Sequence, residues 1–125
     1  DMTGEFPRLD ERFAGLPYRH GYYAASSTNS DKILFDSIAH IDHKTGKRAV
    51  HTFAAGDAPG EPVFVPRTAD APEGDGWLVA TVYRGNTDTS DFVVFDAQDV
   101  ARGPIGEAKL PRRVPFGFHG NWRQA

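Results

Sequence analysis

The sequence predicts an all-β protein, and two observations carry that prediction. Glycine and proline, 13 and 9 of the 125 residues, recur along the chain between short apolar runs, which is typical of turns between short strands. No apolar pattern at helical spacing persists for three turns, so amphipathic helices are not expected. The strands and turns below follow from this rhythm.

Seven runs are expected to form strands because they are rich in β-branched or aromatic residues and are bounded by turn residues. They are Tyr18–Ala25, Ile33–His43, Arg48–Ala54, Glu61–Pro66, Trp77–Arg84, Phe92–Asp96 and Gly106–Leu110. Between the second and third runs, Lys44-Thr45-Gly46-Lys47 offers a glycine for the positive φ of a tight turn, which predicts a hairpin over residues 33–54. The single predicted helical turn is Asp96–Val100.

Two segments share a pattern in which glutamate directly follows glycine at the start of a proline-marked stretch, Gly4–Pro7 and Gly60–Pro66. Proline has no N–H for a sheet ladder, so both segments are expected at sheet edges. The last four strands fall within residues 61–110 with short connections, which favours an antiparallel meander matching one propeller blade. The preceding three strands would supply most of another blade, and on pattern alone a sandwich stays open.

Composition excludes several classes of function. The 14 Lys and Arg against 17 Asp and Glu give a net charge of −3 without long runs of either sign, so a nucleic-acid partner is not expected. With no cysteine there is no disulfide framework or thiolate metal site, which fits a cytoplasmic protein. No apolar stretch predicts a membrane span. We expect residues 1–125 to form one unit without a second domain, and the start Asp1-Met2 suggests a fragment of a longer protein.

The candidate chemistry centres on His119, which lies between glycines and aromatic residues near the chain end. Glycine lets backbone approach a bound centre and aromatic rings exclude water, although a lone histidine in such surroundings is more often a hydrogen-bonded core residue. Glu61 could accept the far N–H of a metal-bound imidazole, or could be a solvated rim residue.

The other four histidines, His20, His40, His43 and His51, are expected to be surface or packing residues. His40 and His43 are three positions apart on a predicted strand and so face opposite sides, which prevents them from chelating one ion.

Five motifs in this order resemble the carotenoid cleavage oxygenase family, which includes carotenoid, apocarotenoid and lignostilbene dioxygenases and the retinal pigment epithelium isomerohydrolase. The motifs are Glu5–Asp10, Gly60–Arg67, Gly76–Val79, Phe95–Val100 and Pro115–Gly120. The resemblance implies the C-terminal part, about two blades, of a seven-bladed β-propeller enzyme. It also implies Fe(2+) on the propeller axis, held by four histidines of which His119 matches the last, with Glu5 and Glu61 matching two glutamates behind the ligands.

That resemblance implies oxidative cleavage of a conjugated carbon–carbon double bond of a carotenoid, apocarotenoid or stilbene by O2. The short loops and the alanine- and arginine-rich composition favour a bacterial source and the stilbene- and apocarotenoid-cleaving branches. Since the other three iron histidines would lie upstream, we expect the isolated chain to be inactive and to self-associate through its exposed strand edges. The alternatives are isomerisation within the same family, or a non-catalytic propeller fragment that serves as a binding or scaffold module.

Overall fold

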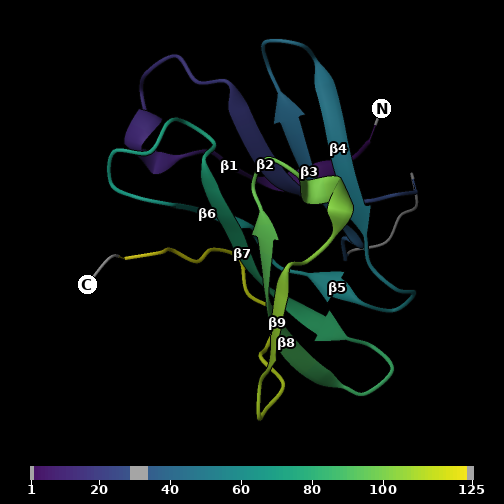
Figure 1. The fold of residues 1–125 in the computed structure, drawn as a ribbon. Coiled ribbons are helices and arrows are strands. Elements are labelled where there is room, and N and C mark those ends of the chain that lie inside the picture. The colour runs from purple at the N-terminus through teal and green to yellow at the C-terminus, as the bar shows by residue number, and fades with distance from the viewer. Residues whose placement is uncertain (1, 29–33, 124–125) are drawn as a thin grey trace.

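The computed structural model describes residues 2–28 and 34–123. Within these ranges the chain forms two antiparallel sheets that lie one beyond the other, with the later part of the chain below the earlier part in Figure 1. We call them the N-terminal sheet (β1–β4) and the C-terminal sheet (β5–β9). The all-β prediction is therefore confirmed.

The N-terminal sheet has the strand order β1-β2-β3-β4. Its strands are β1 (Gly4–Arg8), β2 (His20–Ala25), β3 (Ser37–Asp42) and β4 (Lys47–Thr52), with the 3-10 helix η1 (Glu11–Phe13) between β1 and β2. The predicted hairpin is β3–β4, and Gly46 in its turn has φ 70°. The run predicted over Ile33–His43 forms β3, which begins only at Ser37. Ile33 lies outside the described residues.

The C-terminal sheet has the order β5-β7-β8-β9, and β6 pairs with β7 beyond β5. Its strands are β5 (Ala58–Pro59), β6 (Val63–Pro66), β7 (Gly76–Arg84), β8 (Thr89–Asp96) and β9 (Gly106–Lys109). β5 and β6 together form one interrupted edge, and Glu61 lies in the interruption. The helical turn is the 3-10 helix η2 (Val100–Arg102), which begins where the predicted turn ends.

Both proline-marked segments lie at sheet edges, as predicted. β1 pairs only with β2 among the described strands, and β6 pairs only with β7. Pro7 and Pro66 therefore lie on strands that have one neighbour among the described strands, where a residue without an N–H does not disrupt hydrogen bonding to a second neighbour.

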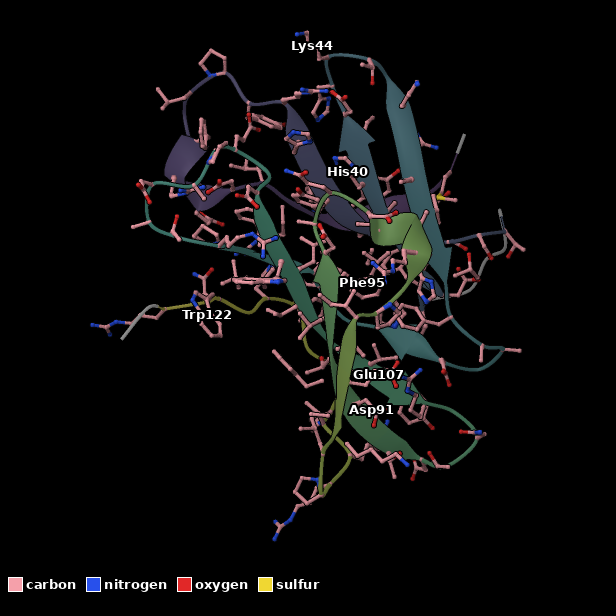
Figure 2. All side chains as sticks on the ribbon, viewed as in Figure 1. His40, Lys44, Asp91, Phe95, Glu107 and Trp122 are labelled. Carbon is pink, nitrogen blue, oxygen red and sulfur yellow. The ribbon has the colours of Figure 1, made fainter. Side chains whose placement is uncertain are left out.

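A shared aromatic core joins the two sheets. Tyr22 of β2 stacks on Phe64 of β6 with ring centroids 5.8 Å apart, and Phe53 meets Phe95 of β8 edge-on at 6.1 Å. Figure 2 shows Phe95 at the place where the sheets meet. Burying each of these side chains contributes about 1.5–3 kcal/mol. The core therefore fixes β2 and β6 relative to each other.

An ion-pair network holds the far end of the C-terminal sheet. Arg84 of β7 donates to Asp57 at 2.9 Å and to Asp91 at 2.7 Å, and it also reaches Glu107 at 3.1 Å. Asp91 and Glu107 lie close together on neighbouring strands in Figure 2. Asp57 and Asp91 are buried, and the carboxylates raise the pKa of Arg84 against the opposing effect of its burial. Arg84 is thus the charge partner that makes these buried carboxylates tolerable.

Candidate metal centre

The C-terminal segment, residues 111–123, carries His119. None of these described residues lies in a strand or a helix, and in Figure 1 the segment (yellow) leaves the C-terminal sheet and passes beside β6. It is anchored by polar contacts, because Val114 N–H donates to Ser90 Oγ at 2.9 Å and Gly120 N–H donates to Glu61 Oε2 at 2.8 Å. The position of His119 therefore depends on side chains of the C-terminal sheet and its edge.

His119 and Glu61 form the centre of the candidate site. His119 Nδ1 lies 3.1 Å from Glu61 Oε1. The Glu61 carboxylate therefore accepts hydrogen bonds from both the His119 imidazole and the backbone N–H of Gly120. The side chain of Glu61 is 4% exposed whereas that of His119 is 74% exposed. Because an ionised carboxylate only accepts, Nδ1 is the donor and Nε2 keeps the lone pair that can bind a metal. This pairing has the chemistry of a metal ligand and the carboxylate that orients it.

Phe6 packs against the imidazole. Its ring meets His119 at a right angle with centroids 5.8 Å apart, and it contacts Phe118 at 6.5 Å. Phe6 has φ 57°, a left-handed conformation that is uncommon outside glycine, and it lies at a register shift between Glu5 and Arg8. Such strain costs about 1–3 kcal/mol and concentrates at functional sites. The bulge in β1 is thus what brings an aromatic ring to His119.

Glu5, the other glutamate predicted to lie behind a ligand, is a residue of β1. Its side chain is exposed and its backbone pairs with Ala24, and no hydrogen bond joins it to His119 within the described residues. Of the two glutamates, Glu61 is therefore the one that orients His119. A role for Glu5 behind a different ligand stays a prediction.

The remaining histidines pack against neighbours. His40 is buried between Tyr22, on which it stacks at 5.1 Å, and His20, whose Nδ1 lies 2.9 Å from His40 Nε2. Burial, helped by the nearby His20, lowers the pKa of His40 to about 4. Exposed His43 meets the Tyr18 ring edge-on, and half-buried His51 contacts Phe53 and Phe95.

Within residues 2–28 and 34–123, no three His, Cys, Asp or Glu side chains are grouped so that they could hold a metal ion. His119 fits the geometry of one ligand, because Glu61 holds its Nδ1 while its Nε2 has no hydrogen-bond partner among the described residues. One imidazole cannot bind a divalent ion tightly by itself. The described residues therefore offer one candidate ligand and do not by themselves form a complete metal site.

His119 lines the first of two adjoining cavities. One of about 350 Å³ is bordered by Glu61, Val63, Val79, Phe118 and Trp122, and a second of about 210 Å³ has a wall formed by other aromatic and aliphatic side chains. That wall includes Phe6, Phe35, Tyr83 and Phe116. The expectation that aromatic rings exclude water from His119 is not met in this chain, because Phe116, Phe118 and Trp122 are themselves exposed.

Sequence reasoning missed two participants. They are Arg8 and Asn121. Arg8 Nη1 lies 3.5 Å from Glu61 Oε1, and Arg8 Nη2 donates a hydrogen bond to Asn121 Oδ1 at 2.7 Å. Arg8 lies within the motif Glu5–Asp10 and Asn121 directly follows the motif Pro115–Gly120, but no spacing in the sequence pairs positions 113 residues apart. None of the helices in the described part of the chain has the length and apolar character needed to span a bilayer.

A family model described as RPE65, retinal pigment epithelial membrane protein, matches residues 1–124. The chain belongs to this family. The match confirms the resemblance to the carotenoid cleavage oxygenases that five motifs had indicated.

Among curated members of the carotenoid cleavage oxygenase family, lignostilbene-alpha,beta-dioxygenase isozyme III of Sphingomonas paucimobilis is 43% identical over 97% of this chain and 26% of its own length. Apocarotenoid-15,15'-oxygenase of Synechocystis is 34% identical over 96% of this chain and 24% of its own. The crystal structure of Pseudomonas brassicacearum lignostilbene dioxygenase superposes with a TM-score of 0.93 at 33% identity, covering all of this chain and 28% of that one. The chain thus spans about a quarter of the length of these relatives.

Proposed function

We propose that this chain is the C-terminal part of a non-haem iron(II) dioxygenase that uses O2 to cleave a conjugated carbon–carbon double bond. The substrate would be a carotenoid, apocarotenoid or stilbene, as the names of its relatives suggest. The observation that carries the proposal is His119, whose Nδ1 is held by buried Glu61 at 3.1 Å so that Nε2 is available to a metal. In this proposal the two sheets are about two blades of a seven-bladed propeller.

His119 would be one of the iron ligands, and the bound iron would supply the redox chemistry for reaction with O2. Glu61 keeps the Nδ1 proton on His119 and fixes the plane of the ring, because its other oxygen is tied to the Gly120 N–H. Phe6 limits movement of the ring from a third side. These contacts prepare the imidazole before a metal arrives.

The cavity that His119 lines and the smaller cavity that adjoins it suit an apolar conjugated substrate. Phe6, Phe116 and Phe118 contribute aromatic rings to the smaller one, and such rings pack against flat polyene or stilbene groups through stacked and edge-on contacts. In the intact enzyme, we expect further chain to cover these exposed rings and keep water from the reacting double bond. This chain alone would therefore be inactive.

The test is His119→Ala in the full-length enzyme, with iron content measured by atomic spectroscopy and products by mass spectrometry. We expect loss of iron and of the two carbonyl products that oxidative cleavage yields. The matched control is His43→Ala, which removes an exposed imidazole that only packs on Tyr18. Normal iron content and turnover in His119→Ala would refute the ligand assignment, and a wild-type protein without iron would favour the scaffold alternative. Isomerised products without cleavage would favour the isomerase alternative.

The isolated chain provides a second test. After anaerobic loading with ferrous ion, we expect little iron per chain here but about one per chain in the protein extended to its upstream start, as a closed four-histidine site requires. Tight stoichiometric iron in the short chain would show instead that several copies assemble a site of their own.

A further inference from the structure

Three segments distant in sequence meet at Arg8. Its Nη2 donates to Asn121 Oδ1 at 2.7 Å and lies 3.0 Å from Glu11 Oε1, while its Nη1 lies 3.5 Å from Glu61 Oε1. The side chain is 12% exposed. Arg8 is thus a largely buried cation at the end of β1 that contacts η1, the β5–β6 edge and the C-terminal segment.

Glu61 requires a positive partner. Its side chain is 4% exposed, and a buried carboxylate is costly unless it is both hydrogen-bonded and paired with a charge. His119 Nδ1 and Gly120 N–H supply the hydrogen bonds. Among the described residues, Arg8 is the Lys or Arg side chain within ion-pair distance of Glu61.

Arg8 also holds the chain on the far side of His119. Glu61 receives hydrogen bonds from His119 and Gly120, and the next residue, Asn121, receives one from Arg8. The bulge between Glu5 and Arg8 turns the Arg8 side chain toward these groups, since β1 advances three residues there while β2 advances two. The backbone around His119 is therefore held by Glu61 and, one residue beyond Gly120, by Arg8.

We propose that Arg8 is a positioning residue of the metal centre, which compensates the buried charge of Glu61 and fixes residues 119–121 through Asn121. The inference rests on the proposed role of His119, but its readouts need no metal. They are the hydrogen-exchange rate of the Gly120 amide and the imidazole 15N chemical shifts of His119, which report the tautomer, both measured by NMR on the metal-free full-length enzyme.

In Arg8→Gln we expect Gly120 to exchange about tenfold faster, the scale of losing a hydrogen bond to a charged group, and the His119 shifts to move toward a mixture of tautomers. Arg8→Lys should recover part of both effects because it keeps a charge near Glu61. The matched control, Arg19→Gln, removes an arginine paired with Asp42 in the same sheet and should change neither readout.

Unchanged Gly120 exchange and His119 shifts in a folded Arg8→Gln would overturn the proposal, and equal effects of lysine and glutamine would overturn the role of charge. Amides of β7 and β8 report whether the sheets stay folded. If Arg8→Gln unfolds them, Asn121→Ala decides, because Asn121 is exposed and outside both sheets; wild-type readouts in that variant would also overturn the proposal. Iron binding by the full-length enzyme is measured separately, so a failure of the proposed function leaves these readouts intact.

Discussion

Glu61→Gln removes one hydrogen-bond acceptor from the centre of the site and leaves the size of the side chain almost unchanged. The carboxylate accepts from His119 Nδ1 at 3.1 Å and from Gly120 N–H at 2.8 Å, whereas a glutamine has one acceptor oxygen and an amino group that can only donate. One of the two N–H groups must then face another donor. Arg8 also loses one of its two carboxylate partners and keeps Glu11.

The expected magnitude follows from the hydrogen bond that is lost. A hydrogen bond to a charged group contributes about 1.5–3 kcal/mol, which is about a ten- to hundredfold change in an equilibrium constant and matches the usual effect of altering the residue that supports a metal ligand. We therefore expect the full-length Glu61→Gln enzyme to bind iron about ten- to a hundredfold more weakly. A competition titration against a chelator under anaerobic conditions measures the affinity.

The matched control is Glu11→Gln. Glu11 also pairs with Arg8, at 3.0 Å, but it is 62% exposed, and ion pairs at the surface contribute little. We expect its iron affinity to stay within about twofold of wild type. Equal affinities for Glu61→Gln and wild type would refute the argument that the buried carboxylate orients His119.

Three further predictions concern the fold. Because burial lowers the pKa of His40 from 6.5 to about 4, the unfolded chain binds this proton first, so the free energy of unfolding should fall by up to about 3 kcal/mol as pH drops from 6.5 to 4; His40→Phe should flatten that slope in denaturant titrations, and an unchanged slope would contradict the assignment. Arg84→Met leaves Asp57 and Asp91 buried without their cation and should cost about 3–5 kcal/mol by chemical denaturation, while a loss below about 1 kcal/mol would show that the network is solvated. The isolated chain should self-associate through its exposed strand edges, helped by exposed apolar residues such as Phe118, which is 77% exposed. Light scattering should show this, and Phe118→Ser should shift the chain toward monomer; a wild-type monomer at high concentration would disprove the prediction.

Local features of the fold could be predicted because their causes are local. The regular glycines and prolines indicated short strands, Gly46 indicated the β3–β4 turn, and prolines indicated the two edge segments. Strand ends were less accurate: β8 begins at Thr89 rather than Phe92, because pairing with β7 extends it beyond its apolar run. The two-residue strand β5 was missed, since its two residues carry no alternation and form a strand only by pairing with β7.

The site divides in the same way. The sequence by itself made His119 a candidate ligand and Glu61 a candidate partner, because both lie in motifs that resemble those of the carotenoid cleavage oxygenases. Only the tertiary structure decided that Glu61, 58 residues earlier, holds His119 while Glu5 does not, and that Arg8 reaches across 113 residues to Asn121. The physical reason is that these contacts depend on how two sheets pack through a common core and on a bulge in β1, and neither is encoded in the spacing of residues along the chain.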